Sequence, residues 1–129
     1  MAQRHIEMIL MRQLASGLAM PVFLVDTRGH LVFYNESAET ILGKRFDETG
    51  PMPIEEWSTA FAPFDDAGKP IDPESLPLVA AALHQKLGSL RFWIKGLDGA
   101  KRQIDVCAFP IIGQNHQMVG AAAIFGEVV

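Results

Sequence analysis

The chain has 129 residues, a net charge of −4 and a single cysteine, Cys107. A chain of this length forms one core, and its 49% share of hydrophobic residues is typical of a globular protein. The acidic balance argues against nucleic acid as a partner. One cysteine excludes an internal disulfide and a cysteine-based zinc site. No apolar run reaches the roughly 20 residues of a membrane span, and no signal peptide is recognisable, so we expect a cytoplasmic protein.

The first predicted element is an amphipathic helix over Gln3–Ala19. Aliphatic residues at every fourth position form one stripe along it: Ile6, Leu10, Leu14 and Leu18. Met8 and Met11 form a second, weaker apolar patch. Such a helix either covers the sheet of the domain alone or also pairs with its copy in another chain, which makes the stripe a candidate dimer interface. We divide the chain into this flanking helix (residues 1–19) and a domain (residues 20–129).

The next segment indicates two short strands and a capped helix. The apolar runs Val22–Val25 and Leu31–Tyr34 flank a turn whose Gly29 can adopt positive φ. Asn35 stands at the N-cap position of a helix over Glu36–Leu42. Contact with a ligand is an alternative role for Asn35, but capping alone accounts for the residue.

Two further helices are predicted in the middle of the chain. Pro53 begins a short one, in which Trp57 and Phe61 are expected to pack inward. The second has one apolar face with spacings of three, four and four residues: Leu76, Val79, Leu83 and Leu87. It ends at Gly88. His84 lies beside that face rather than within it.

The last third of the chain has the alternation of β-strands. Apolar positions share one face of two consecutive strands: Phe92, Ile94, Ile104 and Val106. Pro110 should end the pairing of the second strand. The final strand, Met118–Val129, has small residues from Gly120 to Ala123, which leave room for a neighbouring helix or for a bound molecule. The order of elements predicts an α+β fold with one five-stranded antiparallel sheet and helices on one face.

These stretches resemble the PAS family of sensory domains over nearly the whole chain. The matching segments are Phe23–Asn35, Asp65–Ile71, Pro73–Leu78, Val119–Ala121 and Phe125–Val128. The middle segments look like the PAS subgroup common upstream of bacterial histidine kinases, serine phosphatases and diguanylate cyclases. The resemblance therefore implies bacterial signal transduction of the two-component type, with a signalling helix at one or both ends. Family chains usually continue into a coupling helix after the last strand, so we expect either a fragment or a domain that signals by contact with another protein.

The resemblance also implies a pocket between the sheet and the longer helix, where family members hold haem, flavin, small metabolites, fatty acids or only their own side chains. The pocket residues expected here are Trp57, Leu76, Val79, Leu83, Leu87, Phe92, Ile94, Ile104, Val106, Ala122 and Ile124.

Flavin and haem are both disfavoured as the occupant. The light-sensing flavin branch carries an Asn-Cys-Arg-Phe run on a helix, whereas Cys107 lies on a predicted strand. Haem needs an axial ligand, for which His84 is the candidate, although Gln85 and Lys86 beside it suggest the solvent side. The other histidines have no metal-ligand spacing: His5, His30 and His116.

Two functional hypotheses follow. The first is a PAS-type sensor that binds a small, mostly apolar ligand and relays binding through its flanking helix, or through a homodimer interface, to an output domain or partner protein. The second is a ligand-free interaction or dimerisation module with a filled core. No catalytic set is apparent, so we do not expect an enzyme; a small α+β isomerase is a minor alternative.

Overall fold

The computed structural model describes residues 2–128, with side chains from Met8 onward. Its helices are α1 (Ala2–Gly17), α2 (Glu36–Leu42), α3 (Phe46–Thr49), α4 (Ile54–Ala60) and α5 (Pro77–His84), with short 3-10 turns at Pro73–Ser75 and Gln114–His116. Its strands are β1 (Val22–Val25), β2 (Leu31–Tyr34), β3 (Gly88–Lys95), β4 (Lys101–Ile112) and β5 (Met118–Glu127).

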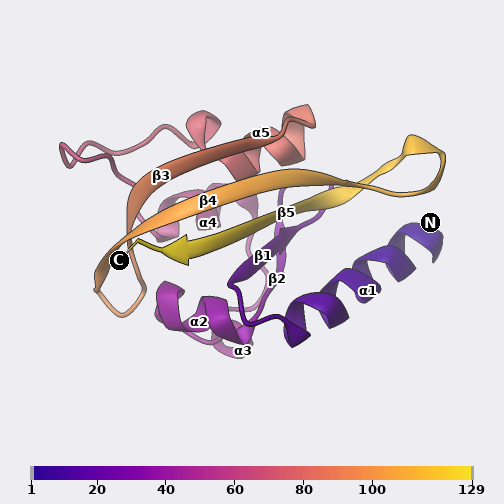
Figure 1. The fold of residues 1–129 in the computed structure, drawn as a ribbon, viewed down its shortest axis with the longest axis horizontal. Coiled ribbons are helices and arrows are strands. Elements are labelled where there is room, and N and C mark those ends of the chain that lie inside the picture. The colour runs from indigo at the N-terminus through magenta and orange to yellow at the C-terminus, as the bar shows by residue number, and fades with distance from the viewer. Residues whose placement is uncertain (1, 129) are drawn as a thin grey trace.

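The five strands form one antiparallel sheet in the order β2-β1-β5-β4-β3 (Figure 1). The amino-terminal hairpin therefore joins the three carboxy-terminal strands, with Phe23 of β1 opposite Ala123 of β5. This arrangement confirms the predicted fold class. No helix in the described part of the chain has the length and apolar character needed to cross a bilayer.

Local chemistry explains the first hairpin and helix. Gly29 has φ of 84°, which an L-residue adopts only with strain, and the Asp26 carboxylate accepts hydrogen bonds from the backbone N–H groups of Arg28 and His30. The Asn35 side chain caps α2 by accepting from the Ala38 N–H at 3.1 Å. Both features are as the sequence predicts.

The longer helix and the strand β4 end at other residues than predicted. The longer helix ends at His84, before Leu87, because Gln85 adopts the left-handed conformation with φ of 53°. Strand β4 continues through Pro110 to Ile112. Proline is tolerated there because its ring nitrogen points toward the β3 side of the sheet, where β3 has already ended at Gly88 opposite Ala108.

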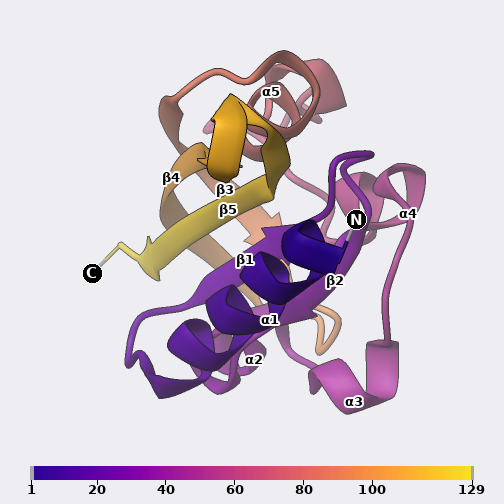
Figure 2. The ribbon, with the colours of Figure 1, turned by 90° about the vertical axis from the view of Figure 1, so that its right-hand side faces the viewer.

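Helices lie on both faces of the sheet. The helices α2, α4 and α5 lie on the inner face, which carries the larger core, while α1 crosses the outer face (Figure 2). The apolar part of this contact consists of buried Ala15 with Met8 and Met11, packed over β1 and β5, and Arg12 lies over the Phe33 ring of β2 at 4.7 Å from its centroid. Gly120 of β5 lies under this contact without a side chain: a Cβ there would lie 2.3 Å from the carbonyl oxygen of Val25 in β1 and 2.8 Å from Met8 Cε of α1.

The aliphatic stripe of α1 does not cover the sheet. Leu10 and Leu14 are each 57% exposed and Leu18 is 37% exposed, while Ile6 lies outside the described side chains. The helix does cover the sheet, as predicted, but the stripe does not make this contact, and its role as a dimer interface stays a prediction. The weaker methionine patch makes that contact because the small Ala15 beside it lets the helix axis come close.

Candidate functional site

The inner face of the sheet and the helices α4 and α5 line an apolar cavity of about 80 Å³ that is partly open to solvent. Side chains from β1, α2, α4, α5 and the three carboxy-terminal strands line it: Phe23, Leu42, Trp57, Ser58, Phe61, Pro63, Leu76, Pro77, Leu78, Phe92, Ile94, Ile104, Val106, Ala123 and Phe125. No polar atom contributes to its accessible wall. Such a surface attracts an apolar molecule and gives water no hydrogen-bond partner.

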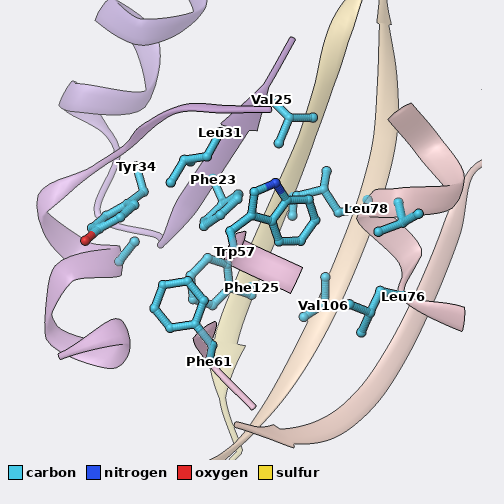
Figure 3. Close-up of a cluster of buried hydrophobic side chains, with 14 of the residues drawn as sticks. Phe23, Val25, Leu31, Tyr34, Trp57, Phe61, Leu76, Leu78, Val106 and Phe125 are labelled. Atoms are coloured by element: carbon cyan, nitrogen blue, oxygen red, sulfur yellow. The ribbon is translucent and has the colours of Figure 1, made fainter. Parts of the chain in front are cut away.

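Trp57 is the central side chain of this wall. Figure 3 shows its indole between Phe23 of β1 and Leu78 of α5. The indole Nε1 donates a hydrogen bond of 2.7 Å to the buried carbonyl of Gly29, and its ring meets the Phe23 ring edge-on at 5.2 Å between centroids. Trp57 therefore ties α4 to the first hairpin while its apolar surface faces the cavity.

The structure brings six of the predicted pocket residues into the lining of this cavity: Trp57, Leu76, Phe92, Ile94, Ile104 and Val106. Val79 is buried in the same core but does not line the cavity. Leu83 and Leu87 are 43% and 79% exposed, so their predicted position in the pocket is wrong. The buried face of α5 instead includes Leu78 and Ala81, and Leu87 lies beyond the end of the helix.

Ala122 and Ile124 lie on the opposite face of β5 from the cavity. Ala122 packs with Ala15 beneath α1, and Ile124 packs against the same outer cluster. Ala123 and Phe125 line the cavity in their place. The prediction was wrong by one residue because side chains alternate along a strand, and both faces of β5 are apolar.

Sequence reasoning also missed lining residues on elements other than the longer helix and the central strands. Phe23 and Leu42 reach the cavity from β1 and α2, and Phe61 and Pro63 reach it from the end of α4 and the segment after it. A signal for Phe23 was available, because the predicted sheet contains the first hairpin; in the structure β1 pairs with β5, and Phe23 shares the face of Ala123.

No model of a known protein family and no curated protein matches this sequence. Solved structures do match it. The PAS domain of a Colwellia psychrerythraea protein aligns with a TM-score of 0.66 at 20% identity, over 95% of this chain and 97% of that one. A light-oxygen-voltage (LOV) protein of Rhodobacter sphaeroides aligns with a TM-score of 0.71 at 10% identity, over 95% and 68%. The chain has the PAS fold.

A third structure extends the comparison. The LOV domain from a blue-light activated histidine kinase of Erythrobacter litoralis aligns with a TM-score of 0.65 at 14% identity, over 86% of this chain and 97% of that domain. This likeness supports the resemblance seen in the sequence.

This PAS fold does not place the two candidate cofactor residues at its cavity. His84 lies on the surface with its ring 3.4 Å from Glu74, so it offers no axial ligand to a haem within the cavity. Cys107 is exposed on the outer side of β4, between Ser89 and Ile124. A cavity of about 80 Å³ is also smaller than the roughly 300 to 1,000 Å³ of pockets for drug-sized ligands. Neither haem nor a flavin fits the cavity as it stands.

The notable charges and polar groups lie away from the cavity. Burial raises the pKa of the Tyr34 hydroxyl, against the opposing effect of its hydrogen bond with Thr49, and this hydroxyl donates to the Lys44 carbonyl at 2.8 Å. Arg91 and Asp105 form a two-contact ion pair on the outer face. Within the described residues, no group of three or more histidine, cysteine or acidic side chains could hold a metal ion. The cavity can therefore recognise an apolar shape but offers no charge.

Proposed function

We propose that this chain is a sensory or regulatory domain that binds a small, wholly apolar molecule between its sheet and the helices α4 and α5. The observation that carries this proposal is the cavity, whose walls expose only carbon. Water in such a site finds no hydrogen-bond partner on the wall. An apolar occupant therefore gains dispersion contacts without displacing hydrogen-bonded water.

The size of the cavity narrows the class of ligand. Its volume of about 80 Å³ is roughly half that of an engineered ~150 Å³ cavity that takes up benzene or xenon. The favoured occupant is a gas or a molecule of a few carbon atoms. A fatty acid or a larger metabolite would require α4 and α5 to move outward from the sheet.

The relay that we propose runs through the shared strands. Phe23 and Ala123 line the cavity, while their neighbours Leu24 and Ala122 lie beneath α1 on the other side of the sheet. An occupant that favours one position of these strands therefore also biases α1, as a shift between two packings. The match to a domain of a histidine kinase supports a role in signalling to an output domain or partner.

We propose binding rather than catalysis as the activity of this site. General acid–base chemistry requires a titratable group within reach of the substrate. Among the described residues, no acidic, basic or thiol side chain lines the cavity.

Xenon is the probe that tests ligand binding. In methyl NMR spectra recorded under xenon pressure, we expect shifts confined to side chains of the lining, such as Ile94, Ile104 and Val106. Ala123→Val directs two methyl groups into the cavity and should abolish these shifts. Ser89→Val, at an exposed position of β3, is the matched control and should leave them unchanged. The absence of xenon-induced shifts, together with no thermal shift across lipids and small metabolites, would contradict the proposal.

A second candidate is a ligand-free dimerisation module. The observation that favours it is the exposed aliphatic stripe of α1, on the side of the helix that faces away from the sheet. The two candidates are compatible when the same helix carries both the dimer contact and the signal. If xenon causes no shifts in the cavity while the chain still associates, the result favours the ligand-free dimerisation module over the sensor.

A further inference from the structure

We propose that Asn35 is a positioning residue that holds α1 against the outer face of the sheet, separately from its capping of α2. The side chain is 1% exposed and all its partners are backbone atoms. Its Oδ1 accepts from the N–H groups of Val22 at 3.0 Å and Ala38 at 3.1 Å. Its Nδ2 donates to the carbonyls of Ala15 and Met20, each at 2.8 Å.

The oxygen and the nitrogen of the amide bond to different elements. The oxygen accepts hydrogen bonds from α2 and from the first residue of β1. The nitrogen donates to the last turn of α1 and to the segment that follows it. Capping needs only the oxygen, and asparagine, aspartate and serine cap helices about equally well. The two N–H donors are what distinguish asparagine here, because a carboxylate has none to offer.

The apolar contact of α1 is thin, so these polar contacts matter. Of the described α1 side chains, Ala15 alone is buried, and Met8 and Met11 are only half-buried. The start of α2 makes a second contact with the same segment: the Ser37 hydroxyl donates to the Ala19 carbonyl at 2.6 Å. The end of α1 is thus attached to α2 and β1 by two side chains, Asn35 and Ser37, that lie two positions apart in sequence.

Asn35 holds α1 whether or not the cavity takes a ligand. It makes the position of α1 depend on β1 at Val22, which adjoins the cavity residue Phe23. Release of the Asn35 amide from α1 should free the helix without unfolding the domain.

Methionine methyl signals test the inference directly. Met8 and Met11 contact the outer face of the sheet, whereas Met52 is buried in the inner core and reports on the domain itself. In Asn35→Asp the acceptor oxygen is kept and the donor is replaced by an oxygen facing two carbonyls. We expect the Met8 and Met11 signals to move to the positions of an unfolded chain and the Met52 signal to stay. Asn115→Asp, the same chemical change in the exposed β4–β5 turn, should move none of the three.

Asn35→Ser removes the two amide N–H donors without burying a charge. Its hydroxyl still caps α2 but is too short to reach Ala15 and Met20, so the same loss of the native Met8 and Met11 signals is expected. This variant decides the question if Asn35→Asp does not fold. Native Met8 and Met11 signals in the serine variant would overturn the inference, since α1 would dock without Asn35. Movement of Met52 together with them would also overturn it, since Asn35 would then hold the whole domain together.

Discussion

The two faces of the sheet are closed in different ways. On the inner face, α2, α4 and α5 bury a continuous cluster of aromatic and aliphatic side chains around a small cavity. On the outer face, a single helix covers β1 and β5 through one buried alanine and two half-buried methionines. The inner layer depends on apolar burial, whereas the outer layer depends on thin packing supplemented by hydrogen bonds from Asn35 and Ser37.

In strand β5, one run of small residues leaves space on both faces of the sheet. Ala121 and Ala123 point to the inner core, and Ala123 leaves part of the cavity open. Gly120 and Ala122 lie on the other side, where their size allows α1 to approach. The same sequence feature therefore produces a cavity on one face and a close helix contact on the other. The four experiments below change one face at a time.

The largest loss in the free energy of unfolding is expected from a substitution on the inner face. Trp57→Ala removes a buried ring and leaves the Gly29 carbonyl without its donor, so the free energy of unfolding should fall by about 3–5 kcal/mol. Chemical denaturation measures the change. The matched control is Trp93→Ala, whose indole is only half-buried and donates to the exposed Asp66 carboxylate; there the loss should be about 1 kcal/mol or less. Equal losses would show that the inner aromatic cluster is not what stabilises the domain.

A smaller effect should follow from crowding the outer face. Gly120→Ala places a Cβ against the Val25 carbonyl and Met8, so we expect a loss of about 1–3 kcal/mol and displacement of Met8 in methyl NMR. Gly126→Ala, on the same strand with no atom within 4 Å of the added Cβ, is the control. If both variants behave as wild type, neither the Val25 carbonyl of β1 nor Met8 of α1 lies as close to Gly120 as the structure has it.

Association should respond to the exposed stripe without loss of the fold. Glutamates at Leu10 and Leu14 place charges on the outward side of α1, so a dimer formed through it should dissociate, while the free energy of unfolding of the monomer changes by only about 0.5 kcal/mol. Analytical ultracentrifugation and denaturation measure the two quantities. Ser16→Glu is the control: it adds a single glutamate at an exposed position on the flank of the same helix, outside the stripe. A chain that stays dimeric with both glutamates does not use this stripe.

The smallest effect belongs to the ion pair on the outer face of β3 and β4. The hydrogen bond from Arg91 lowers the pKa of Asp105. The stabilising contribution of Asp105 is therefore present above the unfolded-state pKa of about 3.9 and is lost as the pH falls through the lower folded-state value. Arg91→Ala should raise the pKa of Asp105 toward its ordinary value in an NMR titration. An unchanged titration would mean that the pair does not form in solution.

Residue chemistry along the chain determined much of this fold. The Asp26–Gly29 turn, the Asn35 cap and the alternation around Phe92 and Ile104 each act within a few residues, and each was predictable. The inner positions of β3 and β4 were predictable because charged residues mark the other side, with Arg91 and Asp105 next to Phe92 and Ile104. A polar face is what makes a period of two informative.

Only the tertiary structure decided the orientation of β5 and α1. Both faces of β5 are apolar, so the pattern does not distinguish Ala122 from Ala123, and a shift of one residue exchanges the faces. Helix α1 likewise has two apolar sides, and the distance allowed by Ala15 and Gly120 selected the methionine side over the larger leucine side. Close packing depends on the shapes of two surfaces together, and one chain segment read by itself contains only one of them.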